Sequence, residues 1–449
     1  MMTPDLLAKY DQPVPRYTSY PTAPHFHAGI DAAAYGSWLE ALDPAQPLSL
    51  YFHVPFCDSL CWFCGCHTRV VNRYEPVATY FELLKQEIAL VAKRLGPGRT
   101  VSHMHFGGGS PTMLIPDDIR RLGDFVWGLF NKAPDAEVAV EIDPRGLSYE
   151  TVRAFASIGV NRASIGVQDV NRQVQEAVNR IQPLSSTAEA MAALRAEGVD
   201  RINIDLMYGL PFQTVSRVLH TVECILPLRP DRLAVFGYAH VPHMKPHMNL
   251  IPGHALPGRD ERFRQQQAIA DLLVEAGHVR IGLDHFAKDS DPLVAALREG
   301  RLHRNFQGYT VDPTEMLIGF GASAIGALPQ GYIQNVTAMP EYRKAIGEGR
   351  LPVARGIALS AEDRLRRAII EQIMCHLRVD LAAMQRDAGL SLDLSGERMA
   401  LETLAADGLV QIEGEILTVP EEARPLLRSV ACVFDAYLAT GKAKHSRAV

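Results

Sequence analysis

The sequence has no long apolar run and little imbalance of charge. No stretch approaches the roughly 18 consecutive apolar residues that a membrane-spanning helix needs, and the opening MMTPDLLAKYDQPVPRYTSYPT lacks the basic-then-apolar layout of a signal peptide. Lys and Arg total 45 against 51 Asp and Glu, so the net charge of -6 provides no overall positive field to attract nucleic acid or an anionic membrane. We therefore expect a cytoplasmic protein that binds neither nucleic acid nor a membrane.

Cysteine is scarce, and its distribution is uneven. Of seven cysteines, Cys57, Cys61, Cys64 and Cys66 fall within ten residues, whereas the others stand alone. An odd number of cysteines, clustered in this way in a chain of 449 residues, favours metal or redox chemistry over a disulfide framework. With 47% hydrophobic and 21% charged residues, the composition also excludes a disordered or fibrous protein.

Strand-like and helical patterns alternate along the first three quarters of the chain. Each parallel neighbour in a sheet needs a long crossover connection, so this alternation predicts an α/β protein with a parallel sheet. Six strand-helix units, rather than eight, favour a partial (β/α)6 barrel over a closed barrel. The predicted strands are residues 48–53, 101–106, 138–142, 162–167, 202–207 and 233–238, and the predicted helices are residues 80–95, 117–130, 149–157, 187–197 and 215–226.

Changes in the pattern of residue types divide the chain into three regions. We expect an N-terminal arm over residues 1–46, the partial barrel with an extension over 47–359, and a mainly helical domain over 360–449. In the arm, the segment PRYTSYPT is too polar and too interrupted by proline to predict a core element.

The C-terminal region predicts a unit like a winged helix. Residues 408–419 predict a short hairpin after a helix, and a last helix is expected over 425–438. Winged helices often bind DNA, but Arg424 and Arg428 are few cations for that task, which favours a packing or substrate-covering role.

The informative motifs directly follow the predicted strands. They occupy residues 53–66, 107–112, 141–144, 168–169, 205–211 and 239–242. Because ligands gather at the carboxyl ends of parallel strands, this placement predicts one shared site.

The first three clustered cysteines have the spacing C-x3-C-x2-C. One loop with this spacing can wrap Cys57, Cys61 and Cys64 around a single iron-sulfur cube and leave one iron without a protein ligand. The alternative is a zinc ion with Cys66 or His67 as a fourth ligand, although the sequence has no second C-x2-C pair of the kind that zinc sites commonly use.

This spacing, with the aromatic Phe63 before the last cysteine, resembles the signature of the radical S-adenosylmethionine superfamily. The resemblance implies a [4Fe-4S] cluster held by Cys57, Cys61 and Cys64, whose open iron binds S-adenosylmethionine. It also implies cleavage of that cofactor to methionine and a 5'-deoxyadenosyl radical by one electron from a reduced donor.

Further motifs resemble one family within that superfamily. These are Cys66, PRYTSYPT at 15–22, HFGGGSPT at 105–112, NIDLMYGLP at 203–211, GYAHVP at 237–242 and HRNFQGYT at 303–310. Together they resemble the oxygen-independent coproporphyrinogen III oxidases. The resemblance implies a monomeric oxidoreductase of haem biosynthesis that converts two propionates of coproporphyrinogen III to vinyl groups. The alternatives are a haem-binding chaperone with the same barrel and an electron-transfer iron-sulfur protein.

The same resemblance implies roles for particular residues. Cys66 and Tyr51 are expected to be catalytic. The residues expected at the cluster-bound S-adenosylmethionine are Tyr51, Phe63, Gly108, Glu141 and Ile325; those expected at a second molecule are Gly109, Ser110, Gln168, Arg180, Asp205 and Ala239. From the residues alone, the glycine triplet allows backbone N–H groups to approach a ligand. For Arg180, a salt bridge to an acidic neighbour on the barrel rim remains an alternative to cofactor binding.

Two other features concern the substrate. Arg16, His303 and Arg304 are candidate cations for its carboxylates, and His240 is expected on the rim of the site, with His243 and His247 on the loop surface. Where the family often has Gln-Arg after AHVP, this chain has Met248-Asn249, which predicts weaker substrate binding if those positions contact a propionate.

Overall fold

A twelve-stranded mixed sheet forms the centre of the computed structural model, which describes residues 3–438 and residue 447. The six predicted strands lie side by side in chain order and are all parallel, which confirms the predicted partial barrel. Strand residues such as Leu50 and Phe52 are completely buried in the main hydrophobic core. These strands are β1 (Leu48–Val54), β4 (Thr100–Gly108), β5 (Asn131–Ile142), β6 (Arg162–Gln168), β7 (Arg201–Tyr208) and β8 (Arg232–Gly237).

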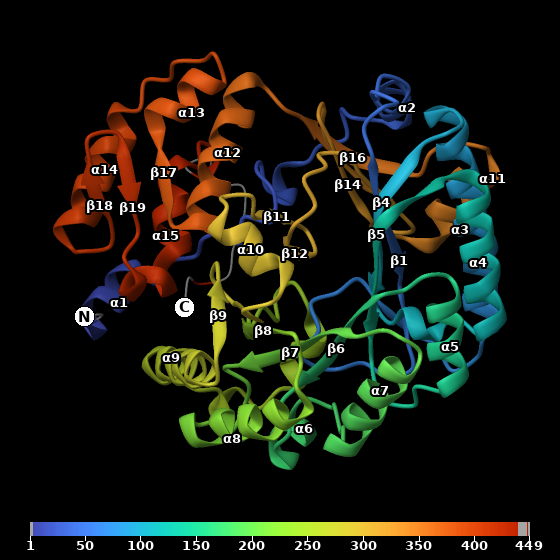
Figure 1. Ribbon diagram of the computed structural model, residues 1–449, viewed down its shortest axis with the longest axis horizontal. Helices are drawn as coiled ribbons and strands as arrows, with labels where there is room; N and C mark the ends of the chain where they lie inside the picture. The colour runs from blue at the N-terminus through green and yellow to red at the C-terminus, as the bar shows by residue number, and fades with distance from the viewer. Residues whose placement is uncertain (1–2, 439–446, 448–449) are drawn as a thin grey trace.

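The predicted crossover helices cover the outer face of these strands (Figure 1). In the longest of them, Phe81, Leu84, Ile88 and Val91 recur at helical spacing and are buried against the sheet, and Gly96, at φ 77°, ends the helix. The helices are α3 (Glu75–Leu95), α4 (Pro116–Leu129), α5 (Tyr149–Ser157), α7 (Leu184–Ala196) and α8 (Val215–Ile225), and a short α6 (Arg172–Ala177) follows β6.

The sheet extends beyond the predicted six strands at both edges. A further strand pairs in parallel with β1, and the remaining strands are antiparallel. They were not predicted because they are short runs of four to six residues that do not continue the regular strand-helix alternation. They are β13 (Leu317–Phe320), β14 (Ile325–Leu328), β15 (Gly331–Asn335) and β16 (Val353–Ala358) on one side, and β10 (His285–Lys288) and β9 (His278–Ile281) on the other.

Small elements complete the barrel region. Two two-stranded sheets are formed by β2 (Phe56–Cys57) with β3 (Arg69–Val70) and by β11 (His303–Asn305) with β12 (Gly308–Thr310). The extension also holds α9 (Arg259–Glu275), α10 (Pro292–Arg298) and α11 (Met339–Gly347).

The C-terminal region has the order of elements of a winged helix. Its three-stranded sheet, ordered β17-β19-β18, contains the predicted hairpin. The predicted last helix is wrong in length, because a helix of five residues, α15 (Leu427–Ala431), is flanked by 3-10 turns and Pro425 lies within the first of them. The other elements are α12 (Ala361–His376), β17 (Arg378–Asp380), α13 (Leu381–Asp387), α14 (Ser395–Ala406), β18 (Gln411–Glu413) and β19 (Ile416–Thr418).

The N-terminal arm is part of the packed structure. It holds α1 (Pro4–Tyr10), beside the C-terminal lobe in Figure 1, and α2 (Ala32–Glu40), which packs on α3. The interpretation of PRYTSYPT as a non-core segment was wrong, because Tyr17 and Tyr20 are buried in the core of the C-terminal region. The Tyr17 hydroxyl donates to Asp435 over 3.0 Å, which satisfies its polar end.

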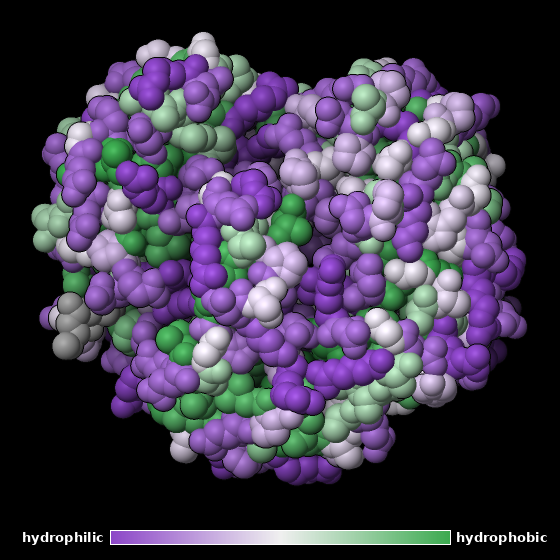
Figure 2. Space-filling view, viewed as in Figure 1, coloured by the Kyte–Doolittle hydropathy of each residue, from purple (hydrophilic) through white to green (hydrophobic). Residues whose placement is uncertain are grey.

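The surface shown in Figure 2 is largely hydrophilic, with hydrophobic residues in smaller areas. Among the described helices, none combines the length and apolar character that crossing a bilayer requires.

Candidate active site

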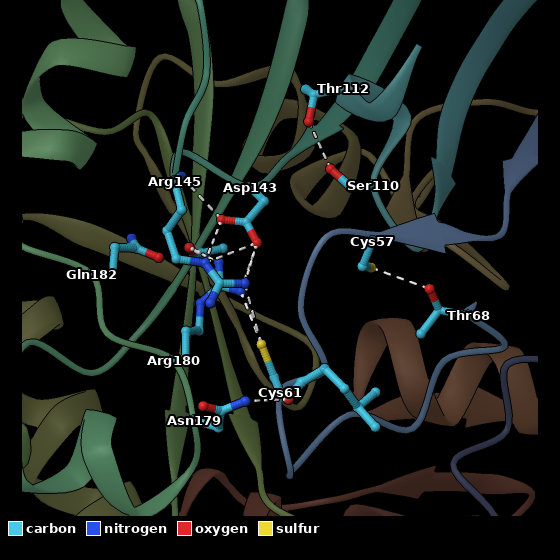
Figure 3. A network of polar contacts seen from close by, with 12 residues as sticks. Cys57, Cys61, Thr68, Ser110, Thr112, Asp143, Arg145, Asn179, Arg180 and Gln182 are labelled. Carbon is cyan, nitrogen blue, oxygen red and sulfur yellow. Dashed lines mark hydrogen bonds and ion pairs between the residues drawn. The ribbon is translucent and has the colours of Figure 1, made fainter. Parts of the chain in front are cut away.

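The loop that carries the four clustered cysteines follows β1 and is held by backbone contacts. At its base, the Val71 N–H donates to the Cys57 carbonyl oxygen over 3.0 Å, beside the paired strands β2 and β3. On its far side, Asn179 Nδ2 donates to the Leu60 carbonyl oxygen over 2.8 Å (Figure 3). The chain itself therefore positions this cysteine loop at the carboxyl end of β1.

All four cysteines of this loop line one cavity of about 190 Å³. Cys61 is buried, Cys57 and Cys64 are partly exposed, and Cys66 is exposed. Among the described residues, no three His, Cys, Asp or Glu side chains are placed to share one metal ion, so the geometry gives the zinc alternative no support. Three thiols spread around a cavity fit a cluster that assigns each thiolate to a different iron.

Two guanidinium groups approach the Cys61 thiol. Arg145 Nη2 lies 3.4 Å and Arg180 Nη1 lies 3.5 Å from Cys61 Sγ, and both arginines pair with Asp143, at 2.6 Å and 3.1 Å (Figure 3). Burial alone would raise the pKa of Asp143, but these two cations hold it below its ordinary value. The network places two guanidinium groups within reach of the Cys61 sulfur.

This network contains residues that the sequence analysis missed. Asp143 and Arg145 were not assigned a role, although D-P-R directly after a predicted strand was an available signal. Arg180 forms the ion pair that was considered as an alternative, and the same side chain also contacts the cysteine loop.

The glycine triplet is needed for close packing. A Cβ on Gly108, whose φ is 115°, would lie 2.7 Å from the ring of His53, and a Cβ on Gly109 would lie 2.6 Å from a carbonyl oxygen of β2. The expectation that these N–H groups face a ligand was wrong, because Gly108 donates to Glu141 over 3.2 Å and Gly109 donates to the Val54 carbonyl oxygen over 2.9 Å. Both glycines still line the cavity through their other backbone atoms.

Two carboxylates face the cavity from β5 and β7. Burial would raise the pKa of Glu141, but hydrogen bonds from His105 and from the Gly108 N–H hold it below its ordinary value. Burial raises the pKa of Asp205 to about 6, although Ser164 donates to it over 3.0 Å. Both carboxylates also line a second cavity of about 290 Å³ inside the barrel, so the two cavities adjoin.

Most of the predicted cofactor residues meet at the cysteine cavity. Those that line it are Phe63, Gly108, Gly109, Glu141, Gln168, Arg180 and Asp205. The remaining ones, Tyr51, Ser110, Ala239 and Ile325, lie outside its lining. Ser110 Oγ lies 2.7 Å from Thr112 Oγ1, Ile325 packs in an apolar cluster, and Ala239 lines a different cavity.

The loop after β8 contacts the cysteine loop. His247 Nε2 lies 2.8 Å from the Cys64 carbonyl oxygen, so the expectation of a surface histidine was wrong. Met248 is buried in an apolar cluster, and exposed Asn249 donates to the Pro246 carbonyl oxygen over 2.9 Å. Met248 therefore cannot take part in the substrate contact that was considered for this pair.

Comparisons with known proteins cover the whole chain. The Radical SAM superfamily model matches residues 51–225, and the HemN C-terminal domain model matches residues 359–426. The oxygen-independent coproporphyrinogen III oxidase of Bradyrhizobium diazoefficiens is 49% identical over 100% of both chains, and that of Synechocystis sp. is 38% identical over 97% of this chain and 95% of its own.

A solved structure is similar to this chain over nearly its whole length. The coproporphyrinogen III oxidase (HemN) from Escherichia coli, described as a radical SAM enzyme, superposes with a TM-score of 0.90 at 37% identity and covers 95% of this chain and 100% of its own. The chain therefore belongs to the oxygen-independent coproporphyrinogen III oxidase family of the radical SAM superfamily.

Proposed function

We propose that this protein oxidatively decarboxylates two propionates of coproporphyrinogen III to vinyl groups and so forms protoporphyrinogen IX without oxygen. The observation that carries the proposal is the convergence of the cysteine loop, Glu141, Arg180 and Asp205 on one cavity, in a chain that matches enzymes of this name from end to end. The names of these relatives give no support to a haem-binding chaperone or an electron-transfer protein.

Cys57, Cys61 and Cys64 are the residues that would hold the [4Fe-4S] cluster, with Cys66 beside them in a catalytic role. When bound, the cluster and S-adenosylmethionine would supply a deoxyadenosyl radical able to remove one hydrogen atom from a propionate, which would then lose CO2 and pass one electron to an acceptor. Arg145 and Arg180 offset the negative charge of the Cys61 thiolate.

Carboxylates at the cavity wall suit the other groups of S-adenosylmethionine. The ionised Glu141 accepts hydrogen bonds from an ammonium group, and Asp205, at a pKa of about 6, accepts them from ribose hydroxyls above that pH. Gly109, Gln168, Arg180 and Asp205 are the wall residues that support a second molecule of this cofactor.

Tyr51 lies beside the cavity as a fixed hydrogen-bond donor. His53 Nε2 must carry the proton because it lies 2.9 Å from the His67 carbonyl oxygen, so Nδ1 accepts from the Tyr51 hydroxyl over 3.0 Å. Burial raises the pKa of Tyr51 and lowers that of His53, and both groups therefore remain neutral. We propose that this pair orients the groups at the mouth of the cysteine loop.

The test is an anaerobic reaction of the reconstituted protein with coproporphyrinogen III, S-adenosylmethionine and a reduced donor. The expected product has lost CO2 and two hydrogen atoms at each of two propionates, as read by mass spectrometry. Cleavage of S-adenosylmethionine with no vinyl product, together with tight haem binding, would contradict the proposal and favour the chaperone.

A further inference from the structure

A cavity of about 480 Å³ at the carboxyl ends of β7 and β8 has six arginines in its lining. It is distinct from the cysteine cavity and lies between the barrel, the N-terminal arm and the C-terminal region. Its charged lining residues are Arg16, Arg259, Arg262, Arg304, Arg428 and Arg447, with Asp11, Asp284 and the histidines His240 and His243.

Three of these arginines have no carboxylate partner among the described residues. Their hydrogen bonds go to backbone carbonyl oxygens: Arg16 donates to Gly237 over 2.9 Å, Arg262 to Tyr238 over 2.7 Å and Arg304 to Tyr17 over 3.0 Å. Guanidinium groups held in this way are oriented while their charge remains uncompensated.

The lining contains two carboxylates, Asp11 and Asp284, against six arginines. Asp11 pairs with Arg447 at 3.3 Å, and Asp284 pairs with His285 at 2.8 Å. The excess of positive charge in the cavity is therefore not cancelled by its own acidic residues.

Burial makes this arrangement unfavourable in the absence of an anion. The Nε–H groups of Arg262 and Arg304 are buried without a hydrogen-bond partner. Burial lowers the pKa of Arg262, and burial together with the charge of Arg16 lowers the pKa of Arg428 to about 10. An entering carboxylate would relieve the repulsion between the arginines.

The arginine-lined cavity is linked to the cysteine cavity by a series of neighbouring cavities that share wall residues. It shares Arg304 with a cavity of about 310 Å³, which in turn shares Asn305 and Asp312 with the barrel cavity. The barrel cavity adjoins the cysteine cavity at Glu141 and Asp205. A row of four neighbouring cavities thus has the cysteine loop at one end and Arg16, Arg262 and Arg304 at the other.

We propose that Arg16, Arg262 and Arg304 form a carboxylate-binding site that holds the propionates of the substrate that are not decarboxylated. The inference rests on the proposed function for the identity of the ligand. Guanidinium groups bind carboxylates in pairs of parallel hydrogen bonds, so the site fixes the orientation of the macrocycle as well as its charge. The propionates that react would then be presented toward the cysteine loop.

The test measures binding of coproporphyrin III, the stable tetracarboxylate form, to the full reconstituted chain by fluorescence quenching. We expect Arg16→Gln, Arg262→Gln and Arg304→Gln each to weaken this affinity at least tenfold and to leave the affinity for S-adenosylmethionine unchanged. The matched control is Arg264→Gln, which lies on the same helix as Arg262 but is exposed and pairs with Glu261 at 2.7 Å. It should bind coproporphyrin III like the unmodified protein.

The tetramethyl ester of coproporphyrin III isolates the role of charge. It should bind weakly to the unmodified protein, and the variants should not weaken it further. The Arg16 side chain is exposed and donates a hydrogen bond to the Gly237 carbonyl oxygen, so its variant carries little risk to folding. Unchanged coproporphyrin III affinity in both the Arg16 and Arg304 variants would overturn the proposal, even if vinyl product forms normally. Arginine-dependent binding without vinyl product in the unmodified protein would instead refute the proposed function and leave the carboxylate site standing.

Discussion

Replacing Arg180 by alanine tests the link between the cysteine loop and the cofactor. The Arg180 side chain is 8% exposed and donates to the Gly166 carbonyl oxygen over 2.7 Å as well as to Asp143. Asp143 keeps Arg145 after the substitution, so the loss is that of charged hydrogen bonds, about 1.5–3 kcal/mol, rather than the larger cost of a bare buried carboxylate. If Arg180 also binds a cofactor carboxylate, the affinity for S-adenosylmethionine falls by about one to two decades.

The cluster itself should survive this substitution. All three thiols that we propose as ligands remain, and Arg145 still lies 3.4 Å from Cys61 Sγ. Iron and acid-labile sulfide would be measured after anaerobic reconstitution, and cofactor affinity would be measured by equilibrium dialysis. Arg172→Ala, in which the lost side chain is 64% exposed and pairs with Glu176, serves as the control. Unchanged affinity, or a loss of iron as complete as in Cys61→Ser, would refute the reasoning.

Three other predictions have distinct expected results. Cys61→Ser should abolish the cluster absorbance, whereas Cys66→Ser should keep the iron and lose turnover; equal iron loss would make Cys66 a ligand. Gly109→Ala should lower iron incorporation, because its Cβ would lie 2.6 Å from backbone of β2, whereas Gly65→Ala, with nothing within 4 Å, should not. Burial raises the pKa of Glu87 to about 7 in the folded state, whereas the unfolded state releases this proton near pH 4.5. The free energy of unfolding should therefore fall by about 3 kcal/mol between pH 4.5 and pH 7 and stay constant above pH 7. Glu87→Gln should flatten this dependence in urea titrations; an unchanged slope would contradict it.

Local patterns in the sequence were sufficient for the barrel strands and their crossover helices. Phe81, Leu84 and Ile88 show the helical period within a few residues, and the cysteine spacing is likewise local. Because parallel strands bring their carboxyl ends to one edge, the order of the elements also predicted that Glu141 and Asp205 would meet the cysteine loop.

Contacts between distant segments decided the rest. PRYTSYPT looked unsuited to a core because the buried surroundings of Tyr17 and Tyr20 come from the C-terminal region, some 400 residues away. The sequence also could not show that Arg145 and Arg180 share Asp143 beside Cys61, or that Arg16 and Arg262 face one cavity without a carboxylate partner. Pairing and burial of charges depend on which side chains the fold brings within a few ångströms of each other, and only the tertiary structure determines those distances.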